Sequence, residues 1–571
     1  MIKIPNSLKY ILSIMLIHKK ILVCNFLLCF CLAGANLIEP ILAQTVIDKA
    51  FYINQEKELL YPSLAWIVIF CSKYIFYYLQ KRINLKYRIQ TFSIIRSYVF
   101  NNILKKPLNF FEGKSSSYII SRINSDIENL NGIMLSNMIF SSLAFIQILI
   151  IFILLFRISP LLFGITVFMK GAEVAINVIF PLKKLYKNHN EALASMDGAV
   201  QDTLQCIKLI KAANTVQFET ARYEEILKRY FEKRVARDSV NIVRETGSNF
   251  IIESSYPIIV IIGGFGIFYK ILSVGSVIAF LIYFQKLTPL FNEVAYVIPT
   301  YKISQASLDR LYEIINIKNE DVDYGEKLSK INSVEFKNVS FSYGDRKVLQ
   351  NLSFTLDCNK VNALVGTSGS GKSTVANMLM GYLKPDSGEI LLNGKKMSFY
   401  KLSDIRKNIS LLYQEHIIFT RSLKENMEYN SSEDNFSSKY RSIVNSANLN
   451  SIIENFHNNI SIILRNNGNN LSGGERQRIC LARELYKDAS LYIFDEATSA
   501  LDAVSEKTVI DNINSLAKRH MVFIITHKLI NIRNADNICV LDNGNIIEHG
   551  NHNELINKQG LYYKLYKQQY M

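Results

Sequence analysis

The first half of the chain contains six long apolar runs separated by polar segments. A run of about 20 apolar residues is long enough for an α-helix to cross the hydrocarbon core of a bilayer. The first run is long and lacks a clean small-residue cleavage site, so we interpret it as a retained span and not as a signal peptide. We predict transmembrane helices near residues 19–46, 59–80, 134–156, 158–182, 248–269 and 276–298.

The pattern changes near residue 333, where short β-like runs such as VEFKNVSFSY, VNALVG, LYIFDE and MVFIIT begin to alternate with helical segments. This alternation is typical of a parallel sheet with helices on its faces. We therefore predict a membrane α-helical bundle over residues 1–315, a linker over 316–332 and an α/β domain over 333–571.

Two of the connections between spans are long, at residues 81–133 and 183–247, and their composition predicts helices that continue the spans into the cytoplasm. Both are rich in Lys and Arg, and positive residues close to span ends favour the cytoplasmic side. We therefore expect both termini and both long connections in the cytoplasm of a bacterial cell, with the chain in the inner (cytoplasmic) membrane. The net charge of +16 then reflects topology and contact with anionic lipid. No arginine-rich or aromatic pattern indicates a nucleic-acid partner.

The chain has eight cysteines and none forms a C-x-x-C pair. Four lie in predicted spans and four in predicted cytoplasmic segments. We expect reduced thiols and no zinc site.

The sequence ALVGTSGSGKSTVANML follows a predicted strand and opens a helix, and it matches the phosphate-binding pattern G-x-x-x-x-G-K-[ST]. Its glycines allow backbone N–H groups to surround phosphate oxygens, and the helix N-terminus adds positive potential. Lys372 would reach the β- and γ-phosphates, and Ser373 would bind Mg²⁺. The expected phosphate-binding residues are Gly366, Thr367, Ser368, Gly369, Ser370, Gly371, Lys372, Ser373 and Thr374.

Two adjacent acids, Asp495 and Glu496, end the apolar strand LYIFDE. Asp495 fits the Mg²⁺-binding aspartate of a nucleotide site, and a carboxylate at Glu496 could polarise an attacking water. Adjacent acids at a strand end are more often a solvated turn, but the phosphate-binding loop upstream favours the catalytic interpretation. His527 ends another strand, and a lone histidine is more often a surface or core residue than a catalytic one.

The stretch LSGGE lies before a predicted helix and has no nucleophile. Ser472, followed three residues later by Glu475, is also typical of a helix capping box. Read alone, a capping role is the simpler interpretation.

The order of these motifs resembles the nucleotide-binding domain of ABC (ATP-binding cassette) transporters, over roughly residues 333–571. The resemblance implies ATP and Mg²⁺ as cofactors, with Tyr343 stacking on adenine and Gln414 touching Mg²⁺ together with Ser373 and Asp495. It implies Glu496 as general base, with His527 and Gln414 in the catalytic group. It also implies that Ser472, Gly473, Gly474 and Asp502 complete an ATP site held by a second copy of the domain.

The first half resembles the six-span exporter subunits of the same superfamily, in which KPLNFFEGKSSSYIISRINSDIENL is similar to the first cytoplasmic coupling region. Asn466 stands where exporters usually carry Glu, and antibacterial-peptide exporters of the microcin type are similar there. The resemblance implies a homodimeric, ATP-hydrolysing exporter in contact with membrane lipid, with a peptide as the expected substrate. A lipid flippase or multidrug exporter is the alternative, and a non-transport ABC ATPase is a remote one. No protease domain is expected before the first span.

Charged residues inside predicted spans are costly and usually face a bundle interior or a wet cavity. Lys170 and Glu173 lie one helical turn apart, so they are candidates for substrate contact or for a simple pair with each other. Lys73 is a further charge of this kind. The residues predicted to contact substrate are Lys170, Glu173, Glu253, Lys286 and Glu293.

Overall fold

The computed structural model describes residues 13–52, 56–179, 182–429, 433–465 and 468–570. The chain forms two compact units. One contains the residues up to Leu104 together with Lys114–Lys318, and the other contains Lys105–Gly113 together with the residues from Asn319 onward. The first unit is helical and the second is α/β, which confirms the predicted fold class.

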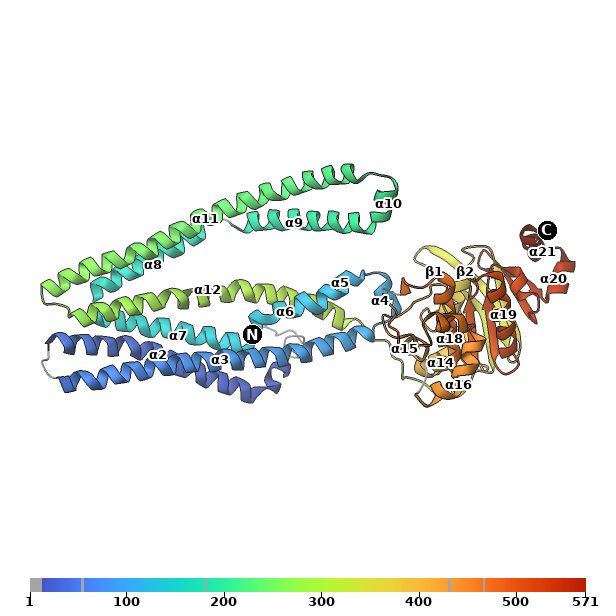
Figure 1. The fold of residues 1–571 in the computed structure, drawn as a ribbon, viewed down its shortest axis with the longest axis horizontal. Helices are drawn as coiled ribbons and strands as arrows, with labels where there is room; N and C mark the ends of the chain where they lie inside the picture. Colours follow the sequence, from blue (N-terminus) through green and yellow to red (C-terminus); the bar gives the residue numbers. More distant parts are fainter. Residues whose placement is uncertain (1–12, 53–55, 180–181, 430–432, 466–467, 571) are drawn as a thin grey trace. The chain divides into compact units, whose positions relative to one another are not determined.

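The first unit is built from long helices that contain the predicted spans (Figure 1). Within the described residues, five stretches are long and apolar enough to cross a membrane, and they include α2, α3, α7, α11 and α12. The fourth predicted span corresponds to α8, which covers 20 described residues. The helices are α2 (Lys19–Tyr52), α3 (Glu56–Leu104), α7 (Leu135–Ile158), α8 (Pro160–Ile179), α9 (Leu182–Gln205), α10 (Ile207–Ala212), α11 (Val216–Phe268) and α12 (Val274–Asn316).

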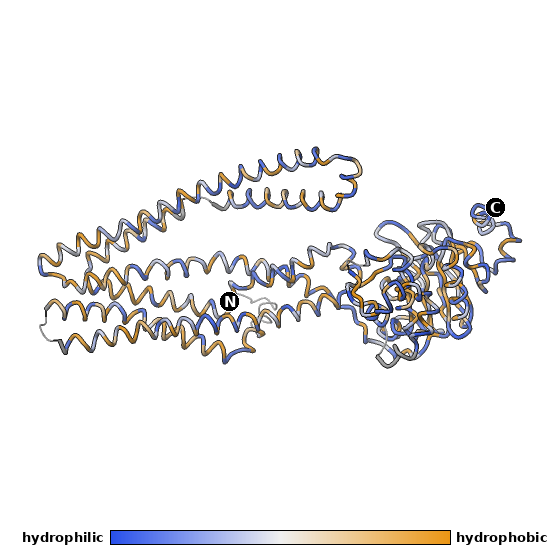
Figure 2. The backbone as a smooth tube through the Cα atoms, in the orientation of Figure 1, coloured by the Kyte–Doolittle hydropathy of each residue, from blue (hydrophilic) through white to orange (hydrophobic). Residues whose placement is uncertain are grey.

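The long connections are helical, as their composition predicts. Helix α3 continues past its apolar part to Leu104, and α9 lies beside the first half of α11 with α10 between them (Figure 1). Figure 2 shows apolar residues concentrated along the spans and a more mixed pattern along α9.

The segment after α3 is broken into short pieces: α4 (Leu108–Glu112), α5 (Ser116–Ser121), the π-helical turn η1 (Arg122–Asp126), α6 (Ile127–Asn129) and η2 (Leu130–Ile133). Asp126, buried in η1, accepts hydrogen bonds from Ser307 Oγ (2.9 Å) and Arg310 Nε (3.2 Å) of α12. Gly132 lies so close to α12 that a Cβ atom there would be 2.5 Å from the Thr300 carbonyl oxygen. These contacts fix η1 and η2 against the end of α12.

The second unit contains a four-stranded antiparallel sheet in the order β2-β1-β4-β5 and a six-stranded sheet in the order β10-β9-β3-β8-β7-β6. Strands β9, β3, β8, β7 and β6 are parallel, and β10 is antiparallel to β9. The strands are β1 (Ser333–Tyr343), β2 (Arg346–Asp357), β3 (Val361–Gly366), β4 (Ser387–Leu392), β5 (Lys395–Lys396), β6 (Ile409–Leu412), β7 (Leu491–Asp495), β8 (Met521–Ile525), β9 (Asn537–Asp542) and β10 (Asn545–Gly550).

Both faces of the six-stranded sheet are buried, as expected for parallel strands covered by helices. On β3, Ala363 and Val365 belong to one apolar cluster and Leu364 to another. On β7, Phe494 and Ile493 divide in the same way. The helical elements that follow β3 in the described residues are α13 (Lys372–Leu379), η3 (Met397–Phe399), α14 (Leu402–Asn408), α15 (Leu423–Met427), α16 (Glu433–Ser446), α17 (Asn450–Asn455), α18 (Gly473–Tyr486), α19 (Ala503–Leu516), η5 (Leu529–Ile532), α20 (His552–Lys558) and α21 (Leu561–Tyr570).

Candidate functional site

The loop between β3 and α13 carries the phosphate-binding pattern. Gly366 ends β3 where a Cβ atom would lie 2.1 Å from the Leu541 carbonyl oxygen, so only glycine fits beside β9. Gly371 has φ of 106° at the N-terminus of α13, a backbone conformation that favours glycine. Thr367, Ser368, Gly369 and Ser373 are exposed, and Ser370, Gly371, Lys372 and Thr374 are buried.

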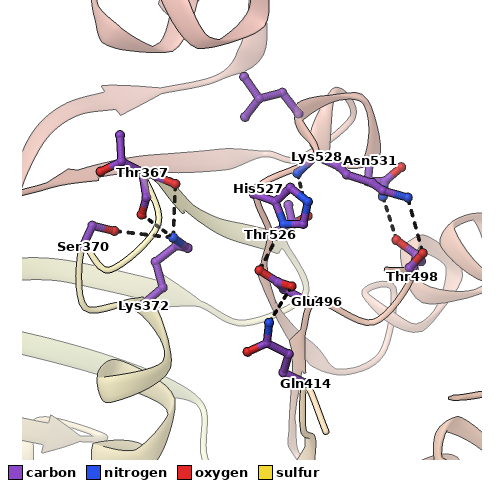
Figure 3. A network of polar contacts seen from close by, with 12 residues as sticks. Thr367, Ser370, Lys372, Gln414, Glu496, Thr498, Thr526, His527, Lys528 and Asn531 are labelled. Atoms are coloured by element: carbon purple, nitrogen blue, oxygen red, sulfur yellow. Dashed lines mark hydrogen bonds and ion pairs between the residues drawn. The ribbon is translucent and has the colours of Figure 1, made fainter. Parts of the chain in front are cut away.

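Lys372 folds back over this loop (Figure 3). Its Nζ donates to the carbonyl oxygens of Thr367 (2.8 Å) and Gly366 (3.1 Å) and lies 3.5 Å from Ser370 Oγ. Burial lowers the pKa of Lys372, although the charges of Glu496 and Asp495 act to raise it. A buried ammonium held mainly by carbonyl dipoles fits an anionic ligand such as a nucleotide phosphate.

Asp495 lies buried at the carboxyl end of β7. Burial raises the pKa of this carboxyl group, and the neighbouring charge of Glu496 adds to the effect, whereas a hydrogen bond with Ser373 opposes it. The structure thus brings together Asp495 and Ser373, two of the three residues predicted to bind Mg²⁺. Oxygen ligands of this kind suit that ion.

Glu496 follows Asp495 with a left-handed backbone, φ 52°, which is uncommon outside glycine. Its Oε2 accepts a hydrogen bond from Gln414 Nε2 at 2.9 Å, and its Oε1 lies 3.0 Å from His527 Nδ1. Figure 3 shows the three side chains in a row. They come from the ends of β6, β7 and β8, which are neighbours in the sheet. The three residues predicted to be catalytic therefore form one connected group.

Gln477 of α18 holds the backbone of this group, and sequence reasoning did not identify it. Its Nε2 donates to the Glu496 carbonyl oxygen (3.2 Å), and its Oε1 accepts from the Ala500 N–H (3.2 Å). The side chain is 1% exposed. A buried polar side chain usually has a polar partner, but the sequence does not show that Gln477 is buried or where its partners lie.

Ser472 caps α18. Its hydroxyl accepts from the Glu475 N–H (3.2 Å), and the Glu475 carboxylate accepts from the Ser472 N–H (2.8 Å). The capping interpretation is therefore correct, and the side chain of Ser472 is also exposed. Gly474 is close to the next loop, since a Cβ atom there would lie 3.0 Å from the Ala500 carbonyl oxygen.

Asp502 is exposed and caps α19, accepting from the Ser505 N–H at 3.0 Å. Tyr343 ends β1 with 46% of its side chain exposed, and its ring packs edge-on against Phe341. An exposed ring of this kind leaves one face open for stacking. Asn466 lies outside the described residues.

A second polar group next to Glu496 was not predicted (Figure 3). Asn531 Nδ2 donates to Thr498 Oγ1 and to Glu506 Oε1, both at 2.8 Å. Lys528 Nζ donates to the same Glu506 oxygen at 2.8 Å. These bonds connect the loop after His527 to the segment after Glu496 and therefore help to fix both.

In the membrane unit, Lys170 and Glu173 pair with each other at 2.8 Å within α8. Lys170 Nζ also donates to Thr288 Oγ1 (2.7 Å) and lies over the rings of Phe284 and Phe291. Both charged side chains are buried, with 7% and 11% exposed. This is the pairing alternative that the spacing left open.

A different cluster joins Lys286 of α12 to Lys73 of α3 through Glu39 of α2, which sequence reasoning missed. Glu39 Oε2 accepts from Lys286 Nζ at 2.5 Å and from Lys73 Nζ at 2.9 Å. Lys286 also donates to the Asn36 carbonyl oxygen at 3.0 Å. Two ammonium groups therefore share one carboxylate, which leaves the cluster with one excess positive charge.

The two remaining candidates differ in burial. Glu293 is partly buried and accepts from Ser141 Oγ at 3.4 Å. Glu253 is exposed on α11. Within the described residues neither forms a hydrogen bond or an ion pair with Lys170 or Lys286, so the candidates do not form a single site.

Comparisons with known proteins agree with the fold and with the presence of an ATPase domain. Residues 349–499 match the family model described as ABC transporter, and residues 22–289 match the model of the ABC transporter transmembrane region. The chain is 31% identical to an ATP-dependent lipid A-core flippase of Aliivibrio fischeri, over 83% of each protein. It is 28% identical to YgaD of Bacillus subtilis, provisionally named as a multidrug export protein, over 83% of this chain and 82% of the relative.

A solved structure of a bacterial Atm1-family ABC exporter with ATP bound has the same fold, with a TM-score of 0.81 over 97% of this chain and 98% of that one, at 22% identity. The membrane-region match excludes the remote alternative of a non-transport ABC ATPase. The predicted ATP-hydrolysing exporter is confirmed at this level. The chain belongs to the ABC transporter family, as a multi-pass half-transporter that joins a membrane region and an ATPase domain in one polypeptide.

Proposed function

We propose that two copies of this chain form an exporter that hydrolyses ATP to move an amphiphile with an anionic head group across the membrane. The observation that carries the ATPase part is the connected group of Gln414, Glu496 and His527 beside the phosphate-binding loop. The excess positive charge of the Glu39 cluster supports the choice of substrate class.

In this proposal the loop Gly366–Thr374 holds the nucleotide phosphates and Lys372 turns from its carbonyl partners to them. Tyr343 stacks on the adenine ring. Ser373, Gln414 and Asp495 would hold Mg²⁺, which would neutralise phosphate charge. The raised pKa of Asp495 is consistent with a carboxylate that binds a cation.

Glu496 takes a proton from the attacking water. His527 and Gln414 hold its two carboxylate oxygens, so the acceptor is oriented before the reaction. Gln477 keeps the Glu496 backbone in its left-handed conformation by binding the carbonyl oxygen. Orientation of this kind lowers the entropy cost of the reaction.

Ser472, Gly473, Gly474 and Asp502 complete the ATP site of the second copy. An exposed Ser472 and the N–H groups at the start of α18 suit a phosphate. Mixed subunits test this arrangement, with Lys372→Ala on one and Ser472→Arg on the other. Both changes then fall on one composite site, so the heterodimer retains one intact site and each mutant homodimer retains none. ATP binding by the mixture no higher than by the homodimers would contradict shared sites.

The lipid-like substrate is the better supported of the two alternatives that the sequence left open. The relatives reported above are named for lipid A-core or multidrug export, and their names do not mention a peptide. Both termini are placed in the cytoplasm in this proposal, because Lys and Arg concentrate in the two long connections.

The substrate is tested with the purified protein in proteoliposomes that contain a fluorescent phosphatidylglycerol or a fluorescent phosphatidylcholine. We expect ATP-dependent movement of the anionic lipid and several-fold less of the zwitterionic lipid. The control is Glu496→Gln, which should move neither. Movement of a cationic peptide in place of either lipid would favour the peptide alternative.

A further inference from the structure

The last helix described, α21, forms hydrogen bonds with the loop that carries His527. Gln569 Nε2 donates to the His527 carbonyl oxygen at 2.7 Å, and Gln569 Oε1 accepts from the Leu529 N–H at 3.1 Å. The hydroxyl of Tyr570 accepts from the Ile530 N–H at 3.3 Å. One side-chain amide thus binds the backbone on both sides of Lys528.

The two N–H groups bound in this way belong to the start of η5 (Leu529–Ile532). The first N–H groups of a helix have no partner inside the helix. Gln569 and Tyr570 supply those partners from another element. The contacts therefore fix the point at which the chain leaves His527.

Contacts with β10 and α20 fix the position of helix α21. Glu548 of β10 accepts hydrogen bonds from the N–H groups of Leu561 and Tyr562 at the start of the helix. At Gly560 a Cβ atom would lie 2.0 Å from Glu548 Oε1, so a larger residue there would displace this carboxylate. Tyr562 is fully buried, and its hydroxyl lies 2.8 Å from His552 Nδ1.

Three of the four tyrosines of α21, Tyr562, Tyr566 and Tyr570, are four residues apart and therefore share one face of the helix. Their rings follow one another, with centroids 6.5 and 5.2 Å apart. The row begins in the core at Tyr562 and ends at the loop after His527. Packing of the helix thus determines where Gln569 and Tyr570 lie.

We propose that Gln569 is a positioning residue for ATP hydrolysis, which holds the His527 backbone so that the imidazole stays beside Glu496. His527 itself is more than half exposed, with 53% of its side chain accessible, so neighbouring side chains restrain it little. Its 3.0 Å approach to Glu496 then depends on the backbone that Gln569 binds. This inference rests on the proposed roles of Glu496 and His527.

The test compares Gln569→Ala with Gln568→Ala in the full-length protein reconstituted in nanodiscs. Gln568 is the adjacent exposed glutamine of the same helix, so it is a matched control. For Gln569→Ala we expect a kcat about 3- to 10-fold lower, the size that one or two hydrogen bonds produce. KM for ATP and the thermal midpoint should stay at the wild-type values, and Gln568→Ala should match the wild type in all three.

A double-mutant cycle with His527→Ala separates positioning from a general structural role. If Gln569 acts through the imidazole, Gln569→Ala should lower the single-turnover rate of wild type but add nothing to His527→Ala. An unchanged kcat in Gln569→Ala, an equal loss in both backgrounds, or a lower thermal midpoint would overturn the inference. Normal hydrolysis by Glu496→Gln would instead overturn the proposed function. An inactive Glu496→Gln together with a normal Gln569→Ala would remove this inference alone.

Discussion

Buried charges are compensated differently in the nucleotide site of the ATPase unit and in the membrane unit. In the ATPase unit, Lys372 is held by carbonyl oxygens and Asp495 has a raised pKa, so each charge lacks a strong opposite partner. In the membrane unit, Lys170 has the Glu173 carboxylate, and Glu39 serves two lysines. Charges that the fold leaves poorly compensated mark ligand sites, whereas closed pairs mark structure.

This comparison separates charged membrane residues that the sequence suggested together as substrate contacts into a structural pair and a candidate substrate cluster. The Lys170–Glu173 pair is neutral and closed, so we interpret it as structural. The Glu39 cluster has one excess positive charge, so its charge is incompletely compensated. The predictions that follow test this division, from the largest expected effect to the smallest.

Glu496→Gln should lower ATP hydrolysis by about 10²- to 10⁴-fold, because an amide cannot take the proton from water. Nucleotide binding should remain, since the phosphate-binding loop is unchanged. The measurements are the ATPase rate and the affinity for a fluorescent nucleotide. Asp488→Asn, an exposed acid just before β7, is the control and should behave as wild type. Near-normal turnover of Glu496→Gln would remove Glu496 from the role of base.

Glu39→Gln should destabilise the protein by up to about 3–5 kcal/mol, because it leaves two partly buried ammonium groups without a carboxylate. Thermal unfolding in detergent measures the loss. Lys286→Met should be milder, since it leaves the Glu39–Lys73 pair intact. It should also abolish stimulation of the ATPase by phosphatidylglycerol. Full stimulation in a well-folded Lys286→Met protein would exclude this cluster from the substrate path.

Lys170→Met and Glu173→Gln should each lower the thermal midpoint, and the double variant should recover most of the loss. We expect a coupling energy of about 0.5–3 kcal/mol, the range for residues in direct contact. Substrate-stimulated ATPase should change no more than basal ATPase. If a stable single variant lost only the stimulation of its ATPase by substrate, Lys170 and Glu173 would contact substrate after all.

Asp495→Asn should slightly raise the thermal midpoint of the nucleotide-free protein at neutral pH while it prevents hydrolysis. Because burial raises the folded-state pKa of this carboxyl, its charged form disfavours folding above that pKa. The wild type should therefore gain stability as the pH falls through the raised pKa, and the difference from Asp495→Asn should shrink. A difference that grows on acidification would show that the carboxylate stabilises the fold.

Much of the ATPase site was predictable because its residues lie in short local patterns. The phosphate-binding loop, Asp495 and His527 each lie at or just after the end of a strand, and the carboxyl ends of parallel neighbouring strands meet at one edge of a sheet. The capping box at Ser472 is also local, since it involves residues three apart. Gln477 and Gln569 were not predictable, because their partners lie in other elements and no periodic pattern records them.

By itself, the sequence determined the spans, the α/β domain and the order of the motifs, because these follow from apolar periodicity and from residues adjacent in the chain. Only the tertiary structure decided which charged side chains of the membrane unit pair with one another. Lys170 and Glu173 have the spacing of a pair, yet spacing cannot exclude a ligand role. Glu39, Lys73 and Lys286 lie on three different helices, so the packing of those helices determines which of these charges pair. In a low-dielectric region a charge pairs with the opposite charge nearest in space, which need not be near in sequence.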